Sequence, residues 1–145
     1  MYDRVVDVPR LVASYALDDG ELPEPIRAMR PAVEQFCEIA FLSAGLNFYR
    51  DGNDSVAPHG DHTERMEEGS PVALVSLGAT RRMTIRSVAK PRRIFDRDLE
   101  PGSLLVMSYA SQLNYLHGIP KTKDPVGERI SIAFRRTPRE YLRRK

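Results

Sequence analysis

The longest helical pattern in the sequence lies in residues 25–41. Apolar residues recur there at spacings of three, four and one, which places them on one stripe of a helix: Ile26, Met29, Val33, Phe36, Cys37 and Ala40. Pro31 interrupts this stretch, and a helix tolerates proline best in its first turn. The pattern therefore predicts one amphipathic helix that begins near Pro31.

After Gly45 the pattern changes to short segments typical of β-strands, separated by turns rich in Gly, Pro, Asn and Asp. Six such segments are predicted, at residues 46–50, 56–61, 72–77, 83–87, 103–108 and 129–135. No helical pattern alternates with them, which argues against a parallel, doubly wound sheet. We expect a mainly β fold, an antiparallel sandwich or jelly roll with one or two N-terminal helices packed outside it.

The last of these segments has two different faces. Ile130, Ile132 and Phe134 alternate with a second set that includes a cation at each end: Arg129, Ser131, Ala133 and Arg135. At about 3.3 Å per residue, the two arginine Cα atoms would lie about 20 Å apart, so their side chains could approach the two ends of a short diacid. Guanidinium groups suit this because they match carboxylate geometry and stay charged when partly buried. The alternative is two solvated arginines on a half-exposed strand.

Length and composition indicate one soluble globular domain over residues 1–145, with 41% hydrophobic and 29% charged residues. The single cysteine, Cys37, excludes an internal disulfide. No apolar run approaches the roughly 20 residues of a membrane span, and the first ten residues lack the apolar stretch of a signal peptide. We therefore expect a cytoplasmic protein that does not enter the membrane, and a monomer.

Charge is distributed unevenly along the chain. Residues 1–80 contain 6 Lys and Arg against 14 Asp and Glu, a net of −8, and residues 81–145 contain 16 against 6, a net of +10. Seven cations accompany one acid, Asp96, across a predicted strand and the loop after it: Arg81, Arg82, Arg86, Lys90, Arg92, Arg93 and Arg97. Such a segment could follow a phosphate backbone, as could the basic C-terminus, Arg136, Arg139, Arg143, Arg144 and Lys145. The alternative is that these residues are an ordinary solvated surface.

Three histidines are present: His59, His62 and His117. His59 and Asp61 are two residues apart, so on a strand their side chains would leave the same face and could bind one ion. With His117 as a third ligand they would form the two-histidine, one-carboxylate set of non-haem Fe(II) oxygenases. One alternative is a hydrogen bond between His59 and Asp61 at a strand end. Another, a zinc hydrolase built on Asp61 and His62, is disfavoured because Ala57 stands where a further histidine is needed.

These features occur together, in an order and spacing that resemble the AlkB family of Fe(II)- and 2-oxoglutarate-dependent dioxygenases. The resemblance runs from about Phe41 to Arg136. It is carried by the segment 47–52 (NFYRDG), the His59 and Asp61 pair with Glu64 after it, 75–78 (VSLG), 102–105 (GSLL), His117 with Gly118, and the closing arginine strand. The family's fold is a double-stranded β-helix, a jelly roll, which agrees with the strand pattern.

The resemblance implies roles for individual residues. His59, Asp61 and His117 would bind Fe(II) as the catalytic and metal-binding set. Arg129 would pair with the distal carboxylate of the co-substrate 2-oxoglutarate, and the rest of that molecule would be held by Asn47, Tyr49, Ser131 and Arg135. The charge pattern, independently of the resemblance, gives Arg81, Arg82, Arg86, Arg92 and Arg93 as the expected nucleic-acid contacts.

The activity implied by the resemblance is oxidative removal of N-alkyl groups, such as methyl, from alkylated bases in DNA or RNA. The reaction would consume 2-oxoglutarate and O₂ and release succinate, CO₂ and formaldehyde. Two alternatives remain open: the same iron chemistry on a protein or small molecule, or a reduced, non-catalytic jelly roll that binds nucleic acid.

The sequence departs from the family pattern at four points. By comparison with the family, we expect a shortened N-terminal nucleotide-recognition region, residues 1–45, with Tyr2 and Arg4 as its remnants. The chain has no Trp, so stacking on a base would use His59, a Tyr or a Phe. Thr63 stands where related enzymes often carry an acid that touches the damaged base, and Ser131 replaces a frequent Asn.

Overall fold

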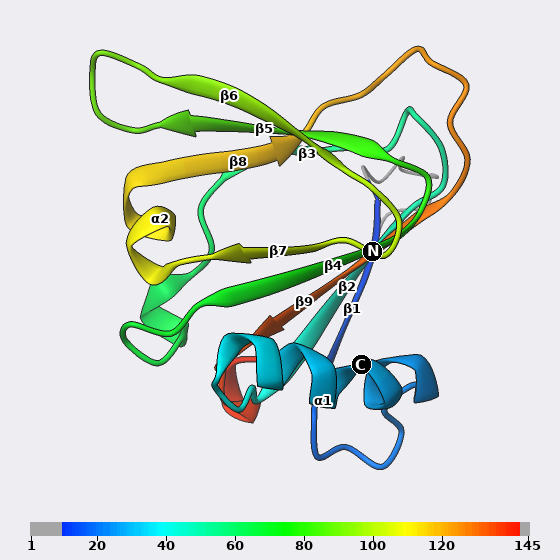
Figure 1. Ribbon diagram of the computed structural model, residues 1–145, viewed down its shortest axis with the longest axis vertical. Helices are drawn as coiled ribbons and strands as arrows, with labels where there is room; N and C mark the ends of the chain where they lie inside the picture. The colour runs from blue at the N-terminus through cyan, green and yellow to red at the C-terminus, as the bar shows by residue number, and fades with distance from the viewer. Residues whose placement is uncertain (1–9, 143–145) are drawn as a thin grey trace, which may run out of the picture.

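The computed structural model describes residues 10–142 and has two antiparallel sheets that face each other (Figure 1). The first sheet has the strand order β1 (Leu11–Ala16), β2 (Ser43–Tyr49), β9 (Arg129–Arg135), β4 (Val72–Gly78) and β7 (Leu104–Met107). The second has the order β3 (Val56–His59), β8 (Tyr115–Ile119), β5 (Arg81–Ser87) and β6 (Ile94–Leu99). This arrangement confirms the prediction of a mainly β jelly roll. Tyr2, Arg4 and the basic residues Arg143, Arg144 and Lys145 lie outside the described residues.

Helix α1 (Glu24–Cys37) covers the outer face of the first sheet (Figure 1). Its buried residues Ile26 and Val33 pack into a core that includes Phe41, Ile132 and Phe134. The prediction that the helix begins near Pro31 is wrong, because it begins at Glu24 with Pro25 in its first turn. Pro31 lies inside the helix on its exposed side, where water can replace the backbone hydrogen bond that proline removes.

Strand β9 lies in the centre of the first sheet, between β2 and β4, and the structure confirms its predicted bounds. Ile130, Ile132 and Phe134 pack on the side of α1. The alternate residues, which include Arg129 and Arg135, line a small cavity between the two sheets. The two faces predicted from the sequence are therefore an apolar core and the wall of an internal site.

Three strands were not predicted from the sequence: β1, β6 and β8. The segment predicted as a loop after β5 forms β6, which pairs with β5 as an antiparallel hairpin. The remaining elements are the short helix α2 (Tyr109–Asn114) and the 3₁₀ turns η1 (Thr63–Arg65) and η2 (Arg139–Tyr141). Among the described residues, no helix is long and apolar enough to cross a membrane.

Candidate metal centre and active site

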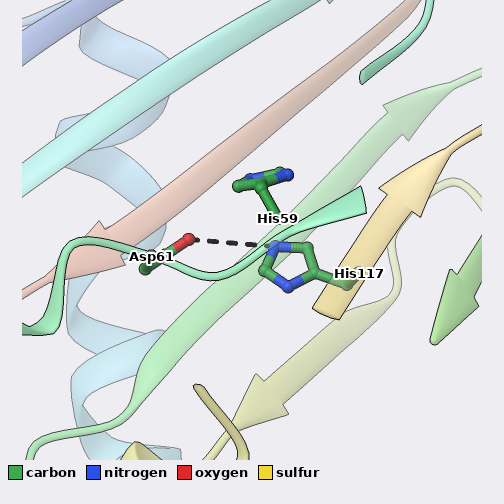
Figure 2. Close-up of side chains that lie close together, drawn as sticks. All are labelled: His59, Asp61 and His117. Atoms are coloured by element: carbon green, nitrogen blue, oxygen red, sulfur yellow. Dashed lines mark ion pairs between the residues drawn. The ribbon is translucent and has the colours of Figure 1, made fainter. Parts of the chain in front are cut away.

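Two strands and a bend bring the predicted ligands together. His59 ends β3 and is the register partner of His117 on β8, so the two rings lie side by side with their centroids 4.5 Å apart. Asp61 lies two residues beyond the end of β3, and its Oδ1 is 3.8 Å from His117 Nε2 (Figure 2). One ligand atom from each of the three side chains lies within 4.8 Å of the other two. The set can therefore hold one metal ion.

Both imidazoles are arranged as metal ligands. His59 Nδ1 lies 2.9 Å from the carbonyl oxygen of Ala57. Because a carbonyl only accepts, Nδ1 carries the proton and Nε2 keeps its lone pair for a metal. Burial, reinforced by the neighbouring His59, lowers the pKa of His117 to about 4, so this ring is neutral near pH 7. Neutral histidine is the form that binds metals.

Asp61 is held as a carboxylate by its neighbours. Burial raises the pKa of this carboxyl, but the charge of Arg135 and its hydrogen bond outweigh burial and leave the pKa below its usual value. Arg135 Nε donates to Asp61 Oδ2 at 2.6 Å. The backbone N–H of Asp61 donates to the side chain of the buried Gln112 at 2.9 Å. These contacts orient the third ligand.

A second feature of the site is the buried guanidinium of Arg129, which is only 1% exposed. Its Nη2 donates to Ser76 Oγ at 3.0 Å, and its Cζ lies 5.0 Å from the centre of the Tyr49 ring. Its Nε and Nη1 are buried with no hydrogen-bond partner among the described residues. Unpaired buried donors are costly, so two of them on one cation indicate that a ligand supplies the partner.

Tyr49 lies close to two cations. The second is Arg81, whose Cζ is 5.6 Å from the ring centre. Burial raises the pKa of the Tyr49 hydroxyl against the opposing charge of Arg129, so the phenol stays protonated and can donate a hydrogen bond. The cation–π contact between the Tyr49 ring and Arg129 helps to hold the Arg129 guanidinium in position.

A small cavity, of about 50 Å³, is lined both by the candidate ligands His59 and His117 and by the buried Arg129. Its walls also include the predicted co-substrate residues and an apolar lining. Those predicted residues are Asn47, Tyr49, Arg129, Ser131 and Arg135. A two-histidine, one-carboxylate set suits Fe(II), and the unpaired donors of Arg129 suit a carboxylate in the same cavity. The residues present therefore fit Fe(II) together with 2-oxoglutarate.

The large cavity, of about 440 Å³, adjoins the candidate metal ligands His59 and Asp61. It lies between β1, β2 and the segment after β3, and its walls include His59, Asp61, Val12, Leu46, Met66 and Tyr141. This volume is within the range of small-molecule sites. A group bound there would lie next to His59 and Asp61 of the candidate ligand set.

Arg81 corrects the predicted nucleic-acid surface. It is 2% exposed, and its guanidinium donates to the backbone carbonyls of Asp51, Asp54 and Pro120. A buried cation with these partners does not reach a phosphate, so Arg81 supports the wall behind Tyr49 instead. Arg82, Arg92 and Arg93 are exposed and Arg86 is partly exposed, all on the β5–β6 hairpin.

Three residues of the site were missed in the sequence: Arg10, Ser76 and Gln112. Each is a common polar residue whose neighbours come from distant segments, so no local pattern marks it. His62 lies outside the ligand set and is exposed beside Glu64, with 3.1 Å between Nδ1 and Oε1. The pairing that a zinc hydrolase would use is therefore not formed.

Comparison with known proteins supports the assignment of an Fe(II) and 2-oxoglutarate site. The model of the 2OG-Fe(II) oxygenase superfamily matches residues 14–135, most of the chain. The chain belongs to this superfamily. Two mouse proteins show that it is of the AlkB type. It is 30% identical over 125 residues to the DNA oxidative demethylase ALKBH2, and 31% identical over 150 aligned positions to the alpha-ketoglutarate-dependent dioxygenase alkB homolog 3.

These matches cover 79% and 88% of this AlkB-type chain, but 52% and 51% of the relatives. The chain therefore spans about half the length of the curated relatives that it matches. The solved structure titled "The structure of OsALKBH1" has the same fold, with a TM-score of 0.61 at 20% identity, over 79% of this chain and 65% of that one.

Proposed function

We propose that this protein is an Fe(II)- and 2-oxoglutarate-dependent dioxygenase that removes N-alkyl groups, methyl above all, from nucleobases in DNA or RNA. One observation carries the proposal. The candidate metal-binding set His59, Asp61 and His117 adjoins the small cavity, which is also lined by Arg129, a buried cation with two unpaired donors. One cavity would therefore offer both a metal position and a cation for a carboxylate.

The proposed binding roles follow from the contacts. His59, Asp61 and His117 would hold Fe(II), and Arg129 with Tyr49 would hold the distal carboxylate of 2-oxoglutarate. Asn47, Ser131 and Arg135 line the rest of the small cavity and would hold the keto-acid end. When bound, Fe(II) with 2-oxoglutarate and O₂ supplies the oxidation of a C–H bond.

The chain's own residues position these groups and exclude water. Arg135 fixes the Asp61 carboxylate, and the Ala57 carbonyl fixes the ring of His59. The small cavity is closed on its apolar side by Leu74, Met83, Met107 and Ile119. Placing the diacid and the ion in one small cavity would confine oxidation to a group that enters from the large cavity.

The large cavity would take the alkylated base. His59 and Tyr141 are aromatic side chains on its wall, on which a flipped base could stack. Oxidation of an N-methyl carbon puts one oxygen atom of O₂ into a hydroxymethyl group, which leaves as formaldehyde with return of the N–H. The other oxygen atom enters succinate as 2-oxoglutarate loses CO₂. ALKBH2, by its name a DNA oxidative demethylase, supports this substrate class.

The β5–β6 hairpin would contact the phosphate backbone through Arg82, Arg86, Arg92 and Arg93. Arg82 is exposed, but it already faces an acid, since its Nε lies 3.6 Å from Asp98 Oδ1. Arg92 and Arg93 lie between the two strands and are exposed. We also propose that the protein acts as a monomer in the cytoplasm, which its mass in solution and cell fractionation would test.

Turnover on a panel of methylated oligonucleotides tests the function. Purified protein is incubated with Fe(II), 2-oxoglutarate and O₂, and succinate and formaldehyde are measured for each oligonucleotide and for its unmethylated copy. We expect methylated DNA or RNA to produce equal amounts of both products, and His117→Ala to produce neither. Succinate without formaldehyde on every oligonucleotide would point to another substrate. Salt-sensitive oligonucleotide binding without any succinate would indicate a non-catalytic binding module.

A further inference from the structure

Arg10 lies immediately before β1 and lines both cavities. Its Nε donates to Asn47 Oδ1 at 2.7 Å. Asn47 is on β2, where it is the register partner of Val12 on β1 and of Ser131 on β9. We find no hydrogen bond from the Arg10 side chain to any other residue that the structure describes. The bond to Asn47 is therefore its one specific polar contact in the described part of the chain.

A guanidinium group can only donate hydrogen bonds, so the oxygen of the Asn47 amide must face Arg10. The amide nitrogen then points the other way, toward Ser131 Oγ at 3.4 Å and the small cavity that Arg129 also lines. Without Arg10, the two ends of the amide have nearly the same shape and either could face the cavity. An amide oxygen that faced a bound carboxylate would repel it.

We propose that Arg10 is a positioning residue that locks the Asn47 amide with its N–H₂ group toward the co-substrate. The inference rests on the proposed function in one respect, that 2-oxoglutarate occupies the small cavity. It gives Arg10, which contacts the diacid only through Asn47, an indirect role in binding it. Arg10 also lines the large cavity, so it lies at the edge of both cavities.

The test is a double-mutant cycle on the affinity for 2-oxoglutarate, measured by calorimetry without O₂ on protein loaded with Mn(II). We expect Arg10→Met to weaken binding about tenfold, the loss of one hydrogen bond to a charged group. In the Asn47→Ala background, Arg10→Met should have no further effect, because there is no amide left to orient. Arg10→Lys, which can still donate to the amide oxygen, should recover most of the affinity.

Controls distinguish this role from a general effect of losing a positive charge and from damage to the fold. Arg27→Met removes an exposed arginine on α1 and should leave the affinity unchanged. Mn(II) affinity should be the same in Arg10→Met as in the unsubstituted protein, and Tm should fall by no more than about 4 °C, the effect of losing one part-buried hydrogen bond. Unchanged 2-oxoglutarate affinity in Arg10→Met, or effects that add in the double variant, would overturn the role of Arg10 alone. Failure of the unsubstituted protein to bind 2-oxoglutarate would instead refute the proposed function.

Discussion

Arg129 is a buried cation with two unpaired donors, and it either binds the carboxylate of 2-oxoglutarate or only supports the fold. Replacing Arg129 by Met distinguishes these two roles. If Nε and Nη1 serve a carboxylate, Arg129→Met removes two charge-assisted hydrogen bonds from bound 2-oxoglutarate. At about 1.5–3 kcal/mol each, they sum to about 3–6 kcal/mol. The dissociation constant for 2-oxoglutarate should then rise by roughly 10²- to 10⁴-fold.

The stability of the ligand-free protein should change little. The substitution removes the hydrogen bond to Ser76 and the stack on Tyr49, which are favourable. It also removes two buried donors that have no partner, each of which costs about 1–3 kcal/mol. Since these contributions oppose each other, we expect the free energy of unfolding to change by no more than about 1 kcal/mol, a shift of about 2–4 °C in Tm.

Calorimetry of 2-oxoglutarate binding and thermal unfolding without ligand measure the two quantities on the same sample. Arg27→Met is the matched control, since it replaces an exposed arginine by the same residue. If Arg129 only supported the fold, its loss would lower the free energy of unfolding by clearly more than about 1 kcal/mol, because its contacts with Ser76 and Tyr49 would then outweigh the two unpaired donors. That result, together with affinity within about threefold of the starting protein, would refute the assigned role.

Three further predictions concern the fold and the surface. Gly78 has a φ of +83°, and an added Cβ would lie 2.4 Å from the Glu128 carbonyl oxygen. Gly78→Ala should therefore cost more than about 2 kcal/mol in urea unfolding. Gly69→Ala, at φ +82° with no atom within 4 Å of the added Cβ, should cost only about 1 kcal/mol; equal losses would contradict this. Arg50 holds the pKa of the Asp54 carboxyl below its usual value through hydrogen bonds, which outweigh burial. That stabilisation is complete above the unfolded pKa of about 3.9 and is lost as pH falls through the lower folded pKa. The stability difference between the protein and Asp54→Asn should therefore shrink in acid, and a constant difference from pH 7 to acid would refute it. Replacing Arg92 and Arg93 by Gln should lower the slope of log affinity against log salt for single-stranded oligonucleotides by about 0.7 for each phosphate that these side chains neutralise. Arg27→Gln should leave that slope unchanged, and an unchanged slope in the hairpin variants would remove the hairpin from the interface.

The sequence predicted the parts of the fold whose pattern is local. The alternation of apolar and polar residues in β9 marked its bounds and both of its faces, because each face is buried against a different layer. By contrast, β6 is an edge strand in which five of six residues are exposed, so its sequence resembles a loop. In β8 the short segment YLHGI lacks a clear alternation, and its strand conformation depends on pairing with both β3 and β5.

The candidate site was predictable as far as its residue types and spacing allow. His59, Asp61 and His117 were selected by spacing and by the resemblance, and the structure brings them together. The strand argument for His59 and Asp61 was incomplete, because β3 ends at His59 and a bend carries Asp61 to the others. Arg81 and Arg82 are adjacent cations, and only the pairing of β5 decides that the first is buried and the second exposed.

The anaerobic titration of Fe(II)-loaded protein with 2-oxoglutarate tests the central claim most directly. When 2-oxoglutarate binds Fe(II) through its keto-acid group, the complex gains a visible metal-to-ligand charge-transfer absorption. We expect this absorption in the unsubstituted protein and in His62→Ala, whose side chain lies outside the ligand set, and its loss in His59→Ala and in His117→Ala. Absence of the absorption in the unsubstituted protein, or its full retention in His117→Ala, would contradict a shared site for the metal and the diacid.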